Sequence, residues 1–163
     1  MDKQTLEFLE LIHLTPATRV LEVSSHADDL SKALALHLET VGGEFHLQLY
    51  PGSHNIPQMD NVKSGEVKDY NSPFRAIARE YSAIVLRDVL DQHKFPDRIV
   101  QATYKSLLNA TELIIVQKKE SMSIDAMKEF LDNNEFRASN EIDIFEDYFV
   151  VVGKKMHMWG AGL

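Results

Sequence analysis

Two groups of polar side chains in this sequence could bind a ligand or transfer protons. The first lies in the stretch Glu22-Val23-Ser24-Ser25-His26-Ala27-Asp28-Asp29, which follows a short apolar run. The second follows another apolar run and consists of Arg87, Asp88, Asp91 and His93. Carboxylates and imidazoles often serve as general acids, general bases and metal ligands. We therefore predict a functional site at each group, with Asp88, Asp91 and His93 as candidates for acid–base or substrate contacts.

Apolar spacing predicts the elements that position the first group. Residues 3–14 and 27–40 repeat apolar side chains with helical period, and Gly42-Gly43 can end the second helix. Two short apolar segments, 20–23 and 45–49, predict strands on either side of that helix. The first polar group therefore lies in the turn between a strand and the helix that follows it.

The rest of the chain continues the alternation of strands and helices. Residues 51–72 predict an irregular loop with a short strand near 66–68, because prolines, glycines and small polar residues interrupt every period. The further elements we expect are helical turns at 73–80 with Phe74 and Ile77 inward, strands at 83–86 and 113–116, a helix at 98–108 capped by Asp97, a helix capped by Ser123, and two terminal strands at 138–145 and 148–155. The two terminal strands are separated by Glu146-Asp147, so we expect an antiparallel hairpin.

This order predicts an α/β fold with three layers. Helices on both faces would cover a Rossmann-like, mostly parallel sheet of about six or seven strands that ends in the antiparallel hairpin. The length of 163 residues favours one domain over 1–163. In open sheets of this type, ligands bind beyond the carboxyl ends of the strands. Both polar groups follow predicted strands, so they are expected at the same edge.

Composition narrows the possible partners. The formal charge of −8 disfavours nucleic acid, because an acidic surface repels phosphates. The chain has no cysteine, which excludes disulfides and thiolate metal sites. The start of the sequence is polar and its apolar runs are too short to cross a bilayer. We therefore expect a soluble cytoplasmic protein without a membrane partner.

The C-terminal tail, residues 156–163, carries Trp159 between two methionines and two glycines. Aromatic residues and methionines are common at protein interfaces. The tail predicts either a contact in a homo-oligomer or a segment folded back over its own sheet.

The order of elements resembles that of the class I S-adenosylmethionine-dependent methyltransferases. The resemblance extends over about residues 5–155 and is strongest in 80–119 and 123–155, which include the Glu135-Phe136 pair and the terminal hairpin. It implies methyl transfer from S-adenosylmethionine to an unknown small-molecule or protein substrate. That chemistry depends mainly on alignment of the reacting groups, so few catalytic residues are implied.

The resemblance also implies a set of cofactor contacts. The family has an acidic residue and a G-x-G-x-G loop after its first strand; this chain keeps the acid as Glu22 and has Ser24, His26 and Asp28 in place of the glycines. Tyr50 lies near the position of the acid that binds the ribose hydroxyls. The other implied contacts are Glu66 and Asp69, near the adenine amine, and Arg87, at the end of a later strand. No metal is implied.

Two alternatives to a methyltransferase remain open. The loss of three glycines favours a non-catalytic binding or assembly module on the same scaffold. The stretch His26-Ala27-Asp28-Asp29 also resembles the H-P-D-D-E motif of zinc-dependent N-acetylglucosaminyl deacetylases, which would make His26 and Asp29 zinc ligands and Asp28 a general base. A simpler interpretation is that His26, Asp28 and Asp29 cap the following helix.

Overall fold

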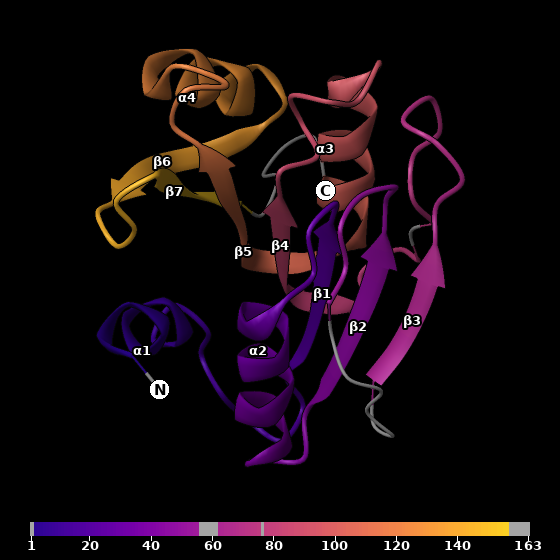
Figure 1. Ribbon diagram of the computed structural model, residues 1–163, viewed down its shortest axis with the longest axis vertical. Coiled ribbons are helices and arrows are strands. Elements are labelled where there is room, and N and C mark those ends of the chain that lie inside the picture. Colours follow the sequence, from indigo (N-terminus) through magenta and orange to yellow (C-terminus); the bar gives the residue numbers. More distant parts are fainter. Residues whose placement is uncertain (1, 56–61, 76, 157–163) are drawn as a thin grey trace.

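Seven strands form a single sheet in the computed structural model, which describes residues 2–55, 62–75 and 77–156 (Figure 1). The strands are β1 (Arg19–Ser24), β2 (Glu44–Leu49), β3 (Val62–Glu66), β4 (Tyr81–Arg87), β5 (Leu107–Lys118), β6 (Phe136–Ile142) and β7 (Tyr148–Lys155). Their order is β3-β2-β1-β4-β5-β7-β6. Strands β1 to β5 are parallel to one another, whereas β7 runs antiparallel to both β5 and β6. The predicted fold class is confirmed.

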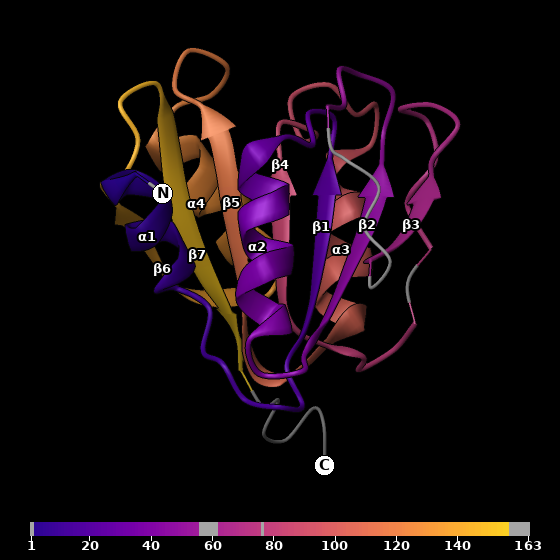
Figure 2. The same cartoon turned by 60° about the horizontal axis from the view of Figure 1, so that its bottom comes forward.

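Within the described residues, four helices cover the two faces of the sheet (Figure 2). They are α1 (Lys3–Leu9), α2 (Asp29–Glu39), α3 (Pro96–Ser106) and α4 (Ile124–Asn133). Alternate residues of a strand face opposite sides, so β1 contributes Leu21 and Val23 to the apolar core beneath α3 and α4. Val20 contributes to the core beneath α1 and α2. Glu22 and Ser24 have the same parity as Val20, which places two polar side chains on the α2 side.

The N-terminal helix is shorter than predicted. It ends at Leu9 instead of residue 14, and the chain continues with tighter turns in which Leu11 donates to the Phe8 carbonyl and Ile12 to the Leu9 carbonyl. Such i→i+3 bonds are common where a helix ends. They still bury Ile12, so the apolar pattern of residues 3–14 reflects burial over a longer segment than the helix itself.

The helix predicted at 98–108 lies two residues earlier. It begins at Pro96, with Phe95 at the N-cap position, so Asp97 lies in the first turn instead of forming the cap. Proline suits that first position because its missing N–H has no helical partner there. At the other end, Leu107 is buried and pairs with Tyr81, which draws it into β5 and ends the helix.

Two predictions for the middle of the chain are wrong. The strand inside the loop 51–72 is Val62–Glu66 instead of 66–68. No helical turn forms among the described residues of 73–80: Phe74 is buried as predicted, but Ile77 is 67% exposed. So short a segment holds too few hydrogen bonds to offset helix nucleation.

In the hairpin, β6 spans Phe136–Ile142 instead of 138–145.

The predicted role of the C-terminal tail falls largely outside the described residues, which end at the exposed Met156. It stays a prediction, which a size-exclusion comparison of the full chain with a 1–155 truncation would test. Among the described residues, no helix is long and apolar enough to cross a bilayer.

Two leucines of α2 test the assignment of its faces. Leu34 is fully buried against the sheet, whereas Leu36 is 42% exposed. We expect Leu34→Ala to lower the free energy of unfolding by about 2–5 kcal/mol, because it leaves a cavity in a packed core. Leu36→Ala should change it by less than about 0.5 kcal/mol. Urea unfolding of both variants measures the difference, and equal losses would contradict the assignment.

Candidate functional site

A buried ion pair joins the ends of β1 and β4. Register places Val85 opposite Glu22 and Arg87 opposite Ser24, so the two charged side chains are diagonal neighbours on the α2 face. Arg87 Nη1 lies 3.3 Å from Glu22 Oε2, and the two side chains are 9% and 0% exposed. The Ser31 hydroxyl of α2 donates to the same carboxylate oxygen at 2.7 Å. Glu22 is thus held by the chain itself.

The same guanidinium also fixes the start of α2. Arg87 Nη2 lies 3.0 Å from Asp28 Oδ1, which also accepts the Leu30 N–H. Asp28 is the N-cap of α2, and its own N–H donates to the Ser31 hydroxyl, which completes a capping box. The interpretation of Asp28 as a helix cap is therefore confirmed. One arginine links two strands and a helix N-terminus.

The backbone of the loop between β1 and α2 is saturated with hydrogen bonds from the chain. Ser25 N–H donates to the Arg87 carbonyl at 3.3 Å, and His26 N–H to the Ser24 hydroxyl at 2.9 Å. Ala27 N–H donates to His54 Nδ1 at 3.1 Å. With the Asp28 N–H on Ser31, four consecutive donors are engaged.

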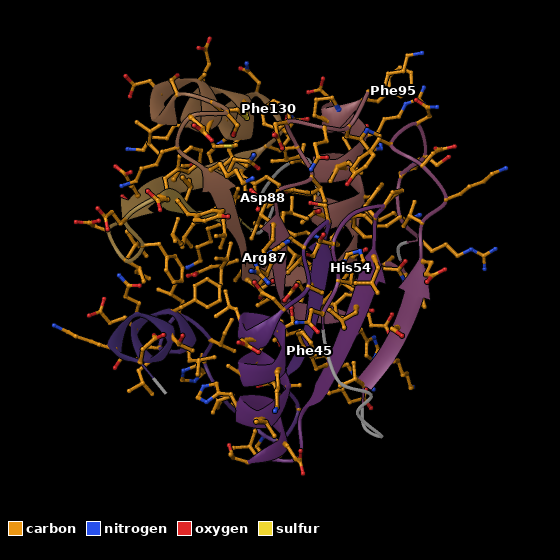
Figure 3. The ribbon with its side chains drawn as sticks, in the orientation of Figure 1. Phe45, His54, Arg87, Asp88, Phe95 and Phe130 are labelled. Carbon is orange, nitrogen blue, oxygen red and sulfur yellow. The ribbon has the colours of Figure 1, made fainter. Side chains whose placement is uncertain are left out.

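The segment after β2 lies directly on this loop. The Tyr50 N–H donates to the Ser24 carbonyl at 2.9 Å. A Cβ on Gly52 would lie 1.9 Å from the Ser25 carbonyl oxygen, so only glycine permits this approach. His54 completes the contact, because its Nε2 lies 2.7 Å from the Tyr50 carbonyl while Nδ1 accepts from Ala27. Figure 3 shows His54 and Arg87 on opposite sides of the end of β1.

Aromatic side chains pack behind this segment. Tyr50 is 1% exposed, its hydroxyl donates to the Ser72 carbonyl at 2.7 Å, and its ring stacks on Tyr70 with centroids 5.1 Å apart. Burial raises the pKa of Tyr50 well above its ordinary value. His93 contacts both rings edge-on, and its nitrogens interact with the Ser72 carbonyl and the Phe95 N–H. Both nitrogens of this predicted acid–base residue are engaged by backbone.

The other two candidates beyond β4 differ in environment. Asp88 is 8% exposed, adopts a positive φ of 54°, and accepts the Lys118 N–H at 3.3 Å. Burial raises its pKa, and the Lys118 hydrogen bond and charge partly oppose that shift. Asp91 is exposed to solvent. Asp88, Asp91 and His93 follow β4 as expected, but His93 faces the aromatic cluster.

The predicted adenine contacts lie farther along the same edge. Glu66 ends β3 and lines an open groove with Tyr50, Pro51 and Lys68. Asp69 Oδ1 accepts the Asn71 N–H at 2.9 Å, which stabilises a local turn. These two carboxylates are separated from the Glu22 cluster by the segment that carries Gly52 and His54.

The zinc interpretation depends on His26, Asp28 and Asp29. His26 Nε2 lies 3.5 Å from Asp28 Oδ2, but Asp28 is already committed to Arg87 and to the helix cap. Within the described ranges, no group of three or more His, Cys, Asp or Glu side chains is placed to hold a metal ion. The interpretation finds no third ligand there.

Several residues that build the site escaped the sequence analysis. They are Ser31, Gly52, His54, Tyr70 and Gln92, which donates from its side chain to the Asp88 carbonyl at 2.6 Å. Most act through backbone contacts, which leave no pattern in sequence. The sequence did contain a signal for the ion pair. Glu22 lies inside one apolar run and Arg87 follows a later one, and each charge would be costly to bury without a partner.

Comparison with known structures identifies the fold. No protein-family model matches the sequence, and no curated protein matches it. A SAM-dependent methyltransferase from Aquifex aeolicus superposes with a TM-score of 0.75 at 12% identity, covering 94% of this chain and 90% of that one. The CurJ carbon methyltransferase gives 0.71 at 10% identity, with 93% of this chain and 52% of that one covered. This chain thus spans about half the length of some of the structures it matches.

A third similar structure is a putative methyltransferase in complex with the Trm112 methyltransferase activator of Haloferax volcanii. Its TM-score is 0.68 at 11% identity, with 94% of this chain and 90% of that one covered. The protein therefore has a class I SAM-methyltransferase-like fold. At such low identity the likeness establishes the fold alone.

The ion pair generates a first prediction for this site. We expect Arg87→Met to lower the free energy of unfolding by about 3–5 kcal/mol, because Glu22 would remain as an uncompensated buried charge. The double variant Glu22→Gln/Arg87→Met should lose less than the single one. As a control, Arg137→Met, at a half-exposed pair, should cost at most about 1 kcal/mol. Urea unfolding of Arg87→Met, Glu22→Gln and the double variant measures the coupling, and additive losses of the two single variants in the double variant would contradict it.

The raised pKa of Asp88 generates a second prediction. When the pKa of a carboxyl is higher in the folded protein than its unfolded value of about 3.9, the group contributes to the free energy of unfolding only while it is protonated. That contribution is lost as the pH rises from the unfolded pKa to the folded pKa. Asp88→Asn should therefore raise Tm relative to the native protein at pH 7, and more than it does at pH 3, where both side chains are neutral. Asparagine also tolerates a positive φ.

Thermal melts at the two pH values measure the difference between Asp88→Asn and the native chain. Asp91→Asn, at the exposed neighbour, serves as the control and should show little dependence on pH. A lower Tm for Asp88→Asn at pH 7 than at pH 3, each relative to the native chain, would show that the carboxylate is stabilising in its charged form.

Proposed function

We propose that this protein is a non-catalytic binding module on a methyltransferase scaffold. The observation that carries the proposal is the saturated loop between β1 and α2. A glycine-rich loop binds a nucleotide cofactor because its backbone approaches the ligand and offers N–H donors. Here the four donors from Ser25 to Asp28 bond within the chain.

The contacts above the loop support the same conclusion. Gly52 lies against Ser25, and the ribose-contact position is taken by Tyr50, whose hydroxyl is committed to Ser72. Glu22, the acid that the resemblance assigns to the cofactor, pairs with Arg87 and Ser31. The residues present therefore do not fit S-adenosylmethionine in the family's manner, and we derive no methyl-transfer step.

Small molecules and proteins are both suitable ligands for such a module. A protein partner has a parallel in the structurally similar methyltransferase that is complexed with the Trm112 activator. The alternative function, a methyltransferase, is supported by the fold alone. The binding module and the methyltransferase differ in whether they bind S-adenosylmethionine.

Calorimetric titration with S-adenosylmethionine and S-adenosylhomocysteine tests the proposal. We expect no saturable binding at ligand concentrations of about 1 μM to 1 mM, the range in which the KM values of enzymes usually fall. The Aquifex aeolicus methyltransferase serves as a positive control for the ligand stocks. Saturable binding that is lost in Glu22→Gln, in a variant that still melts cooperatively, would overturn the proposal and restore the methyltransferase interpretation.

A further inference from the structure

A cavity of about 200 Å³ opens on the α1–α2 face of the sheet, beside Arg87. It borders the loop between β1 and α2, whose His26 and Asp28 line it, and it extends toward α1, the start of α2 and the segment that precedes β7. Its apolar wall is formed by Leu30, Val116 and Phe145, and its polar wall includes Asp28, Arg87 and Tyr148. The site could therefore take a small molecule with a hydrocarbon part and a polar end.

Charged side chains of both signs surround the cavity. Arg87 faces two carboxylates, Glu22 and Asp28, at 3.3 and 3.0 Å. Burial raises the pKa of Tyr148, and the Asp88 and Asp28 charges add to that shift while Lys118 and Arg87 oppose it. Two carboxylates thus lie against the buried guanidinium and offset its charge. Arg87 therefore has little net attraction left for an anion, whereas the partly exposed Asp28 carboxylate can attract a cation.

Two polar side chains keep capacity for a ligand. Arg87 is 9% exposed, yet within the described part of the chain its Nε has no hydrogen-bond partner. A buried donor without an acceptor is costly, so a ligand oxygen that reached it after a small movement of the Arg87 side chain would be favoured. The Asp28 side chain is 34% exposed, and its Oδ2 has the His26 imidazole at 3.5 Å as a partner. This oxygen is an acceptor for a ligand ammonium group.

We propose that this cavity binds a small organic ammonium ion that carries an oxygen acceptor and a short hydrocarbon group, which is the chemistry of an amino alcohol. The ammonium group pairs with Asp28, the oxygen accepts from Arg87, and the hydrocarbon contacts the apolar wall. The inference rests on the proposed function, since it gives the binding module a ligand class.

Titration of isotope-labelled protein followed by NMR tests the ligand class. Leucinol supplies all three groups, 4-methylpentan-1-ol lacks the amine, and leucine adds a carboxylate. We expect leucinol to bind at least about tenfold more tightly than either analogue, because the charged contact is partly shielded from water. The largest shifts should fall on the amides of Thr5, Leu30 and Val116, which line the cavity. Equal affinity for the three probes, or shifts confined to other residues, would overturn the proposal.

A matched pair of variants tests the contact with Asp28. Asp28→Asn keeps a good helix cap but removes the charge, so leucinol affinity should fall at least about tenfold. Asp125→Asn makes the same change in the first turn of α4, far from the cavity, and should leave the affinity unchanged. An undiminished affinity in Asp28→Asn would overturn the proposal.

The same samples separate the two proposals. If S-adenosylmethionine binds and the binding is lost in Glu22→Gln, the non-catalytic function fails whatever the result with leucinol. If neither S-adenosylmethionine nor leucinol binds, the ligand class fails and the non-catalytic function stands.

Discussion

The buried ion pair between Glu22 and Arg87 is the constraint on which the carboxyl edge of the sheet depends. Removing either charge would leave the other in a site without water, so the two must be kept together. Their pairing follows from parallel strands in register, which place an acid on β1 diagonal to an arginine on β4. Through Asp28, the same arginine fixes the first turn of α2. The loop between β1 and α2 is therefore held at both ends by one side chain.

The rest of the edge is arranged around this fixed loop. The segment after β2 approaches so closely that Gly52 cannot carry a side chain, and His54 bridges the Ala27 N–H to the Tyr50 carbonyl. Behind it, Tyr50, Tyr70 and His93 form an aromatic cluster whose polar atoms are paired with backbone. The backbone N–H groups of the loop that a ligand would otherwise contact are bonded within the chain, while Glu22 Oε1 is buried without a partner among the described residues. The bonded loop is the physical basis for our proposal that the methyltransferase fold is kept here without cofactor binding.

Space for a ligand is retained on the α1–α2 face. There the sheet presents Arg87 and Tyr148 to a cavity that α1 and α2 do not fill. Its surroundings contain more carboxylates than cations, and Arg87 keeps an unpaired donor among the described residues. The same arginine thus stabilises the closed loop on one side and offers a contact on the other. Binding at this cavity and closure of the loop are consequences of one buried charge.

The sequence by itself determined most of the elements and the fold class, because burial imposes periodic patterns on helices and strands. It placed Glu22, Arg87 and Asp88 at strand ends, and it identified Asp28 as a cap, since capping depends on neighbours along the chain. The boundaries at Leu9, Pro96 and Leu107 depended on local turns and pairing that periodicity does not record. Tertiary structure alone decided that Gly52 and His54 close the loop, because residues 25 or more positions apart meet there through backbone atoms, which every residue carries alike.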